Sequence, residues 1–396
     1  MPSPEKWGWM RTKVAIAGAG PAGLLLSQLL HLRGIDSVVL ESRDRAYVER
    51  RQRAGMLEQG TVDVLRRSGV GERLDREGLT HQGLELRFGG VGYRIPLTEL
   101  TAGHTVTIYA QTEIVKDLIA ARLAAGGDIR FGAEVLDIDP GTPSVTFRQD
   151  GEIRTLDCDI VAGCDGFHGV SRSAVPGLRT YEREYPFGWL GVLAEVAPST
   201  DELIYAYSER GFALHSLRSP RISRLYLQVD PGDDIEAWPD ERIWSELRAR
   251  FATTDGWELR EGPILEKSIT PMRSFVAEPM RHDRLFLAGD AAHIVPPTGA
   301  KGLNLAISDV TVLAEALGAW HESGDEDLLD AYSGTCLKRV WRAQQFATWM
   351  TTLLHKDPAQ DAFEHRRQLA YLEYLAASKA AATTLAENYV GAAPTL

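Results

Sequence analysis

The feature that most constrains the fold is the hexapeptide GAGPAG at residues 18–23, in which glycines recur with the spacing G-x-G-x-x-G. The apolar run 13–17 before it predicts a buried strand, and the run 21–33 predicts a helix. A second apolar run at 37–40 predicts another strand. Strand, helix and strand in this order form a βαβ unit, so we expect an α/β fold that begins close to the N-terminus.

The glycines Gly18, Gly20 and Gly23 point to a ligand as well as to a turn. Glycine lets the backbone turn tightly and approach a pyrophosphate, whose charge is stabilised at the start of a helix. Glu41 lies 18 residues beyond Gly23, at the end of the second strand, where a carboxylate accepts hydrogen bonds from a ribose. A tight turn without a ligand is the alternative for the glycines alone. Strand, helix and acid together favour a dinucleotide.

The stretch GDAAHIVPPTGAKGLNLAISD, residues 289–309, indicates which dinucleotide. An apolar strand at 285–288 ends at Gly-Asp, two prolines follow, and a new helix is predicted from about Gly302 through Leu303 and Asn304. Asp290 can accept hydrogen bonds from ribityl hydroxyls, and the free N–H groups of the helix start stabilise negative charge on a reduced flavin. NAD needs no such second site, whereas FAD extends across the fold. We therefore expect FAD.

Composition excludes several classes of function. The 396 residues include 55 acidic and 43 basic side chains, a net charge of −12, which argues against wholesale nucleic-acid binding. Three scattered cysteines are too few for a disulfide framework or a zinc site, so we expect no metal. The N-terminus lacks the apolar core of a signal peptide, and the apolar stretch 14–30 is broken by glycines and a proline. These features predict a cytoplasmic protein outside the membrane.

The middle of the chain differs in character from both ends. Strand-like segments dominate from about 185 to 269, with one predicted helix at 240–252, and helical patterns fill the chain after the second nucleotide motif. We expect a Rossmann-like FAD-binding fold of the glutathione-reductase type, an inserted mixed β-sheet domain that binds substrate, and a helical C-terminal part. The expected divisions are 10–80, 98–180 and 270–355 for FAD, 81–97 and 181–269 for substrate, 356–396 for a helical segment that could form a dimer interface, and 1–9 for a flexible extension.

A third motif, GCDGFHGVSR at 163–172, places Asp165 at the end of another strand, which by itself is a common structural turn. Combined with GAGPAG, Glu41 and GDAAHIVPPTGAKGLN, it resembles the class A flavin-dependent aromatic monooxygenases from about Arg11 to Val390. The segments ELIYAYSERGFALHSLRS, YPFGWLG and AENYVG are similar to those of members that act on 4-hydroxybenzoate. The resemblance implies reduction of FAD by NADPH or NADH, reaction with O2 through a flavin hydroperoxide, and hydroxylation of that acid at C3 to 3,4-dihydroxybenzoate. Such enzymes are commonly homodimers.

The resemblance also implies a pocket for the aromatic acid. Arg218 would pair with the substrate carboxylate, with Ser216 and Tyr226 as hydroxyl donors. Ser216 and Arg218 are two residues apart in a predicted strand and therefore face one side. Pro297 and Thr298 would form the wall and the hydrogen-bonding edge beside the phenol. From the sequence alone, a surface arginine on a strand is the alternative for Arg218.

Removal of the phenol proton needs a relay, for which the resemblance supplies three residues. Tyr205 would lie nearest the phenol oxygen, Tyr389 would follow it, and His81 would pass the proton to solvent. A near-neutral pKa suits histidine for that last step. Tyr207, which interleaves with these residues, could narrow the pocket or touch the relay.

The remaining cofactor residues follow from the same resemblance. Arg224 would govern the position of the flavin, Lys301 would lend positive potential, and Asn304 would lie against the ring. Further matches to FAD-binding positions are Arg53 and Gln111, and those to nicotinamide-binding positions are Tyr47, Arg51, His168 and Arg273. The run ESRDRAYVERRQR also fits a solvated charged helix, so the choice between NADPH and NADH stays open.

Three other functions compete with this interpretation. A sibling hydroxylase for another aromatic acid would keep Gly18, Asp165 and Asp290 but change the substrate pocket. A nicotinamide-only dehydrogenase would explain GAGPAG and leave Asp290 without a role. A non-catalytic nucleotide sensor would fit the fold but not the tyrosine and histidine relay. A flavin spectrum in the purified protein would exclude the last two.

Overall fold

The predicted βαβ unit forms the centre of a parallel sheet. Strand β2 (Val14–Ala17), helix α1 (Pro21–His31) and strand β3 (Ser37–Glu41) follow one another as expected. All four residues of β2 are buried because β3 lies on one side of it and β13 (Ile160–Gly163) on the other. A central parallel strand covered on both faces needs an unbroken apolar sequence, which is the pattern seen at 14–17.

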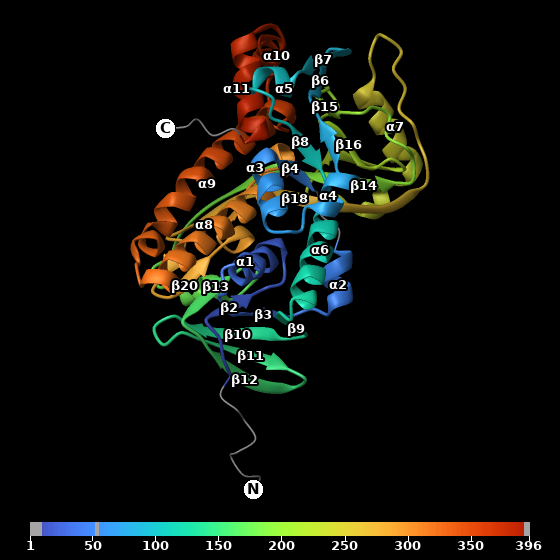
Figure 1. Cartoon of the computed structure of the whole chain (residues 1–396). Coiled ribbons are helices and arrows are strands. Elements are labelled where there is room, and N and C mark those ends of the chain that lie inside the picture. The colour runs from blue at the N-terminus through green and yellow to red at the C-terminus, as the bar shows by residue number, and fades with distance from the viewer. Residues whose placement is uncertain (1–9, 52–54, 392–396) are drawn as a thin grey trace.

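Residues 10–51 and 55–391 are described by the structure, a computed structural model of the chain. Within them this sheet, parallel except for its antiparallel edge strand β19, has the strand order β19 (Arg281–His282), β20 (Leu285–Leu287), β13, β2, β3, β9 (Asp128–Phe131). Helices α1, α6 (Gln111–Ala124) and α8 (Gly302–Ser323) pack around it (Figure 1). Length and composition would let α8 cross a membrane, but 61% of its most apolar window is buried in the protein, so it serves as a core helix.

A β-meander closes the end of the molecule that carries the N-terminus (Figure 1). It consists of β10 (Glu134–Asp139), β11 (Ser144–Gln149) and β12 (Glu152–Asp157), joined by β1 (Met10–Arg11) in parallel with β12. The sequence Gln149-Asp150-Gly151-Glu152 predicts a hairpin turn between β11 and β12, and this turn has φ of 53° at Asp150 and 80° at Gly151. Two successive positive φ values are the requirement of a type I′ turn, which explains the Asp-Gly pair.

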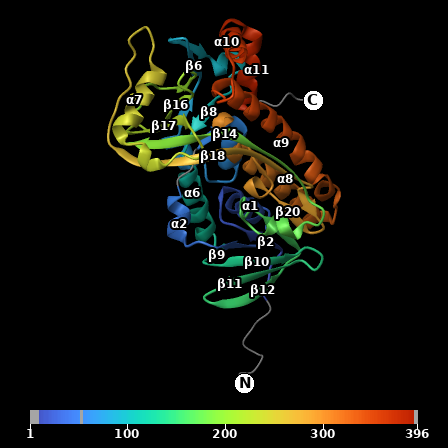
Figure 2. The same ribbon diagram turned by 180° about the vertical axis from the view of Figure 1, so that it is seen from behind.

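The β-rich middle of the chain forms a mixed sheet, as predicted. Its order is β21 (His293–Ile294), β18 (Ile264–Glu278), β14 (Arg179–Ala194), β17 (Ile222–Val229), β16 (Ala213–Ser219), β15 (Leu203–Ala206), β6 (Leu84–Phe88), β7 (Val91–Ile95). Helix α7 (Asp240–Phe251), predicted at 240–252, packs against this sheet. The long antiparallel strands β14 and β18 run from the mixed sheet toward the parallel one (Figure 2).

Short elements and the C-terminal helices complete the fold. A three-stranded sheet contains β4 (Met56–Glu58), β8 (Val106–Ile108) and β5 (Leu79–His81). The short helices are α2 (Arg45–Arg50), α3 (Gln59–Arg67), α4 (Glu72–Glu77) and α5 (Leu97–Leu100), with 3-10 turns η2 (Ser171–Ala174), η3 (Ile235–Ala237), η4 (Gly289–Ala291) and η5 (Pro297–Gly299). The chain ends with α9 (Asp327–Leu354), α10 (Ala362–Ala377) and α11 (Lys379–Val390).

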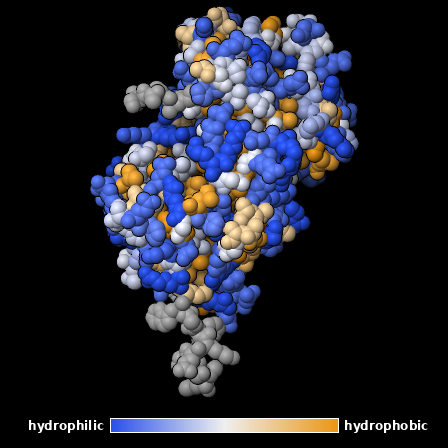
Figure 3. Space-filling model, viewed as in Figure 1, coloured by the Kyte–Doolittle hydropathy of each residue, from blue (hydrophilic) through white to orange (hydrophobic). Residues whose placement is uncertain are grey.

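The interior formed by the described residues is divided into three apolar clusters. One fills the parallel-sheet half, and a second lies between the mixed sheet and α7. The third brings β6 and β15 together with α9, α10 and α11, and it contains Tyr205 and Tyr389. The face shown in Figure 3 is mostly hydrophilic, with hydrophobic residues scattered over it. The proposed catalytic tyrosines therefore lie in the core shared by the mixed sheet and the C-terminal helices.

Candidate active site

Three motifs that are far apart in the sequence meet at the carboxyl edge of the parallel sheet. β13 pairs with β2 on one side and with β20 on the other, with Gly163 opposite Ala17 and Leu287. Just beyond this register, the Cys164 amide donates to the Ala17 carbonyl at 2.9 Å, and the Ala288 amide donates to the Gly163 carbonyl at 3.0 Å. The carboxyl edge of a parallel sheet is where such folds bind their ligands.

The fingerprint glycines serve two different purposes. A Cβ on Gly18, whose φ is 101°, would lie 2.4 Å from the Cys164 carbonyl oxygen, and one on Gly23 would lie 2.0 Å from the Gly18 carbonyl oxygen. Those two glycines let neighbouring backbones pack closely. Gly20, by contrast, has no atom within 4 Å of an added Cβ. The backbone there is open to a group such as a pyrophosphate, directly before the start of α1.

Carboxylates follow each of the three strands. Glu41 accepts from the Ala19 amide at 2.8 Å, so its carboxylate lies against the glycine turn. Asp165 accepts from Ser171 through Oδ2, while its buried Oδ1 has no hydrogen-bond partner among the described residues. Burial raises the pKa of Asp165. Asp290 is exposed in η4, just past β20. An open Gly20 and a buried carboxylate oxygen without a partner fit the ribityl and pyrophosphate groups of FAD.

Helix α8 begins at the same edge, directly after the Pro297–Gly299 turn. Its N-cap residue Lys301 provides no side-chain hydrogen bond to the helix start, so the first-turn amides at Gly302, Leu303 and Asn304 keep their donors. Ala300 before it has a φ of 50°, which turns the chain sharply into the helix. The positive end of α8 is thus available to the reduced flavin ring.

The side chains of Lys301 and Asn304 make protein contacts at this helix start. Lys301 is buried and donates to Glu58 at 2.7 Å and to the Tyr389 carbonyl at 2.9 Å. Burial lowers its pKa, and Glu58 opposes that change. The side-chain amide of Asn304 accepts from the Glu58 backbone N–H and the Thr61 hydroxyl, and it donates to the carbonyls of Met56 and Ala300. In this conformation Asn304 joins α8 to β4 and α3, and its amide is fully used by these contacts.

The phenol end of the site is a buried pair of tyrosines. The hydroxyls of Tyr205 on β15 and Tyr389 on α11 lie 2.8 Å apart, and Tyr205 donates to the Thr298 carbonyl at 3.2 Å. Burial raises the pKa of both phenols, so both are neutral at pH 7. Pro297, beside Thr298, is exposed and can form a wall. Because both hydroxyls can donate and accept, the pair can move a proton along itself.

His81 differs from the expected near-neutral histidine at the solvent. It is 1% exposed at the end of β5, and neither ring nitrogen has a hydrogen-bond partner among the described residues. Burial lowers its pKa to about 4, opposed by the charges of Glu202 and Asp201. The sequence could not show this burial, because it arises from the packing of strands distant along the chain. His81 is therefore a neutral, buried base in this conformation.

The other end of the site is positively charged. Ser216 and Arg218 lie on β16, and their strand partner β17 carries Arg224 opposite Ser216. Arg218 donates to Thr112 Oγ1 at 2.9 Å, and burial together with the charge of Arg224 lowers its pKa. Neighbouring guanidinium groups of like charge are stabilised by an anion between them.

An aromatic wall stands beside this positive end. The Arg224 guanidinium lies 5.4 Å from the ring centre of Tyr226, which contacts the Trp189 ring at 4.7 Å. Trp189 stacks on Phe212, and Phe212 lies 6.2 Å from the ring of Tyr205. The positive end and the phenol end are thus joined by a continuous set of aromatic contacts.

Comparison with known proteins identifies the family. A model described as "FAD binding domain" matches residues 11–347. A p-hydroxybenzoate hydroxylase of Acinetobacter baylyi is 52% identical over 386 residues, which cover 96% of each chain. The chain belongs to the p-hydroxybenzoate hydroxylase family. A rifampicin monooxygenase of Streptomyces venezuelae is 31% identical over 81% of this chain and 67% of its own length. The structure of p-nitrophenol 4-monooxygenase from Pseudomonas putida has the same fold, with a TM-score of 0.83, 21% identity and coverage of 97% and 100%.

Membership of the p-hydroxybenzoate hydroxylase family decides between the classes of function. The protein is an FAD-dependent monooxygenase that uses a reduced nicotinamide. The dehydrogenase and sensor alternatives are excluded. The expected fold class, with an FAD-binding domain, a mixed sheet and C-terminal helices, is confirmed.

The residues expected to bind the nicotinamide fall into two groups. Tyr47 and Arg51 are exposed on and after α2, the predicted charged helix. His168 and Arg273 both lie against Phe167, whose ring is 5.1 Å from the His168 ring and 4.9 Å from the Arg273 guanidinium. Arg53, which was expected to bind FAD, lies outside the described residues. These roles stay predictions.

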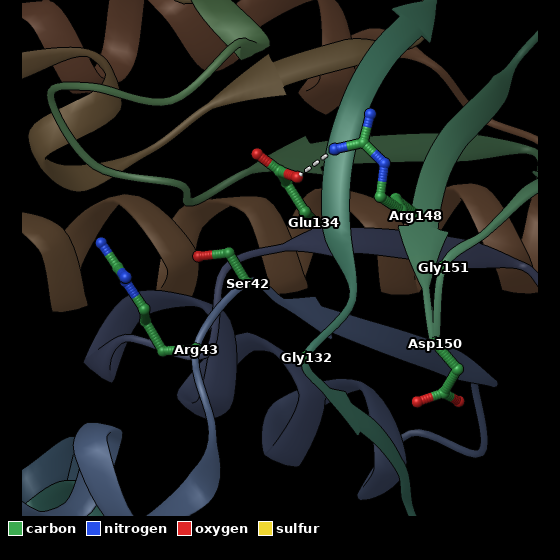
Figure 4. Close-up of a pocket in the computed structure, with 7 residues that line it drawn as sticks. All are labelled: Ser42, Arg43, Gly132, Glu134, Arg148, Asp150 and Gly151. Atoms are coloured by element: carbon green, nitrogen blue, oxygen red, sulfur yellow. Dashed lines mark hydrogen bonds and ion pairs between the residues drawn. The ribbon is translucent and has the colours of Figure 1, made fainter.

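A pocket of about 380 Å³ lies next to Glu41, between the end of β3 and the meander (Figure 4). Arg148 in its wall is directed at Glu134, to which it donates at 2.8 Å. Arg43, on the opposite wall, lies over the Tyr47 ring at 5.3 Å. The pocket contains acidic and basic groups alike, so it does not form a dedicated phosphate site.

The structure adds residues that the sequence did not indicate. Gln111 opens α6, and the next residue, Thr112, accepts from Arg218, which links a proposed FAD contact to the proposed carboxylate ligand. Tyr207, which was expected at the pocket or the relay, instead bonds to His365 of α10 at 2.7 Å. No local sequence pattern around Thr112 or His365 predicts these contacts, because their partners Arg218 and Tyr207 are far away in the sequence.

Proposed function

We propose that the protein hydroxylates 4-hydroxybenzoate at C3 and forms 3,4-dihydroxybenzoate, with O2 and NADH or NADPH as co-substrates. The observation that carries this proposal is the pairing of a buried tyrosine relay at one end of the site with two arginines at the other. It is supported by the 52% identity to a p-hydroxybenzoate hydroxylase. Residues 10–80, 98–180 and 270–355 would bind FAD, and 81–97 with 181–269 would bind the acid.

FAD, held by the glycine turn, Glu41, Asp165, Asp290 and the start of α8, would supply hydride acceptance and oxygen activation. The protein would contribute position and protons. Arg218 would bind the carboxylate through its planar guanidinium, with Ser216 and Tyr226 as further donors.

Proton removal would make the ring electron-rich. In the structure the Tyr205 hydroxyl donates to the Thr298 carbonyl. When the substrate hydroxyl donates to Tyr205, the Tyr205 hydroxyl would turn from that carbonyl to Tyr389 and pass its own proton on, because a phenol with a raised pKa exchanges one proton for another and does not hold a negative charge. His81, whose lowered pKa keeps it neutral at pH 7, would receive the proton only in passing and release it to solvent at the far end.

The test is anaerobic reduction followed by turnover. The FAD-loaded protein is mixed with NADH, and separately with NADPH, with and without 4-hydroxybenzoate, and flavin bleaching is followed before O2 is admitted. We expect the acid to accelerate reduction and the product to be 3,4-dihydroxybenzoate. 3,4-Dihydroxybenzoate and 4-aminobenzoate serve as comparison substrates. Equal efficiency on all three acids, or reduction indifferent to them, would contradict the proposed substrate and favour a sibling hydroxylase.

We further propose a cytoplasmic homodimer that uses α10. Phe363 and Tyr374 on this helix are 72% and 53% exposed, and Tyr371 beside them is 41% exposed. Exposed aromatic clusters of this kind mark interaction surfaces. Light scattering on the wild type and on Tyr374→Lys tests the proposal, with loss of the dimer in the variant as the expected result.

A further inference from the structure

The last turn of α9 and its cap residue contact Thr298 at the phenol end of the site and Trp189 beside the positive end. Thr351 is fully buried, and its hydroxyl hydrogen-bonds to the Thr298 hydroxyl at 2.8 Å. The Thr298 carbonyl accepts from Tyr205, so Thr351 supports the segment that faces the phenol end. One turn later, His355 follows the helix as its cap residue and is 2% exposed.

The two contacts of His355 fix its tautomer. Nδ1 lies 2.8 Å from the Thr351 carbonyl, which can only accept, so Nδ1 carries the hydrogen. Nε2 then has a lone pair, which accepts from the Trp189 indole N–H at 2.7 Å. Burial keeps the ring neutral by lowering its pKa to about 3. Every polar atom of the imidazole is therefore satisfied inside an apolar core.

Aromatic rings hold the imidazole plane. His355 stacks on Phe187 with ring centres 4.6 Å apart and planes 8° apart, and on Phe212 at 4.3 Å. Trp189, whose indole His355 anchors, contacts Tyr226 at 4.7 Å. A leucine or phenylalanine at 355 would fill the space without directing the indole, so the histidine adds orientation that packing alone does not give.

We propose that Thr351 and His355 are positioning residues that set the spacing between the phenol end and the carboxylate end, and so select a carboxylate attached directly to the ring. Thr351 holds the phenol end through Thr298. His355 holds the carboxylate end through Trp189 and Tyr226. Because both belong to one helical turn, the two ends cannot move apart independently. This inference rests on the proposed function of the same site.

The experiment compares 4-hydroxybenzoate with 4-hydroxyphenylacetate, which is longer by one methylene. Three variants are measured: His355→Phe, which keeps a ring but loses the acceptor, His355→Gln, which restores an acceptor, and Thr351→Val, which keeps the shape but loses the hydroxyl. Thr352→Val is the matched control, because Thr352 is exposed and its hydroxyl bonds only within α9. The readouts are KM and kcat for each acid, and the Kd of each acid from the change in flavin fluorescence.

For His355→Phe we expect KM and Kd for 4-hydroxybenzoate to rise about tenfold, the magnitude of one lost hydrogen bond, with kcat little changed. The preference for 4-hydroxybenzoate over 4-hydroxyphenylacetate should fall together with this affinity. His355→Gln should recover most of the loss, and Thr351→Val should lower kcat more than it raises KM. An unchanged preference in folded, FAD-bound His355→Phe and Thr351→Val would overturn the proposal.

Two outcomes of this experiment stay separate. If the wild type neither binds nor hydroxylates 4-hydroxybenzoate, the proposed function fails. The kinetic constants of the variants for this acid then have no wild-type value to be compared with. If the wild type turns it over and the variants keep the same preference, only the positioning role fails. If His355→Phe does not retain FAD, the preference measured for Thr351→Val decides.

Discussion

The hydroxyls of Tyr205 and Tyr389 lie 2.8 Å apart although 184 residues separate them in the sequence. One belongs to an inner strand of the mixed sheet and the other to the last helix. The contact therefore forms only when the C-terminal helices pack on the sheet. The proposed proton transfer through this pair would depend on that packing.

Tyr205→Phe removes the first relay group and should lower kcat about 100-fold, the range for loss of a positioned acid–base group. The Kd of 4-hydroxybenzoate should change little, because the arginine end still binds the carboxylate. Steady-state kinetics and a flavin titration measure the two effects. Tyr207→Phe is the control, since its hydroxyl bonds to His365 and not to Tyr389. A Tyr205 variant with unchanged kcat would exclude this tyrosine from the relay.

Arg218→Met should weaken binding of 4-hydroxybenzoate by about 100-fold or more, because it removes a buried charge partner of the carboxylate. The methionine keeps the apolar stem, so the fold should persist. Arg221→Met, on the exposed turn between β16 and β17, is the control. Equilibrium titration of both variants gives the comparison. Equal affinity in the two variants would show that the carboxylate lies elsewhere.

Local sequence patterns predicted the framework of the fold, but they did not predict the contacts between residues that are far apart in the sequence. The βαβ unit, the Asp150-Gly151 hairpin and the start of α8 at Gly302 each depend on a few consecutive residues, so their signals are visible in the sequence. His81 was expected at the solvent because its own segment does not show what covers it. The His355 contact joins residues 166 apart and has no local signature.

Acid should destabilise the protein through His81. Its pKa is about 4 when folded and 6.5 when unfolded, so at pH above 6.5 it is neutral in both states. As pH falls from 6.5 toward 4, only the unfolded state gains the proton, and folding loses about 1.4 kcal/mol per pH unit. His81→Gln should therefore show a shallower fall of Tm between pH 6.5 and 4.5. His321→Gln, at an exposed site, should match the wild type, and a wild-type slope in both variants would contradict the prediction.

The Asp44 carboxylate at the start of α2 should disfavour the 2′-phosphate of NADPH relative to NADH, if this helix receives the adenosine end of the nicotinamide cofactor. Asp44 caps the helix, with its carboxylate accepting from the Tyr47 amide at 2.7 Å, and Arg45 is paired with Glu49 at 2.7 Å. A 2′-phosphate would meet a carboxylate at the helix start, where a phosphate otherwise binds well.

The ratio of the flavin reduction rate with NADH to the rate with NADPH, measured by stopped flow at low cofactor concentration and low salt, reports this effect. Asp44→Ser keeps a capping side chain and removes the negative charge, so it should lower the ratio of the NADH rate to the NADPH rate. Asp361→Ser makes the same change at the start of α10, where Asp361 accepts from the Glu364 amide at 2.8 Å, and should leave the ratio unchanged. A charge acts on any anion that comes within a Debye length of it. Equal ratios of the NADH rate to the NADPH rate in the wild type and in Asp44→Ser would therefore mean that the 2′-phosphate does not approach α2.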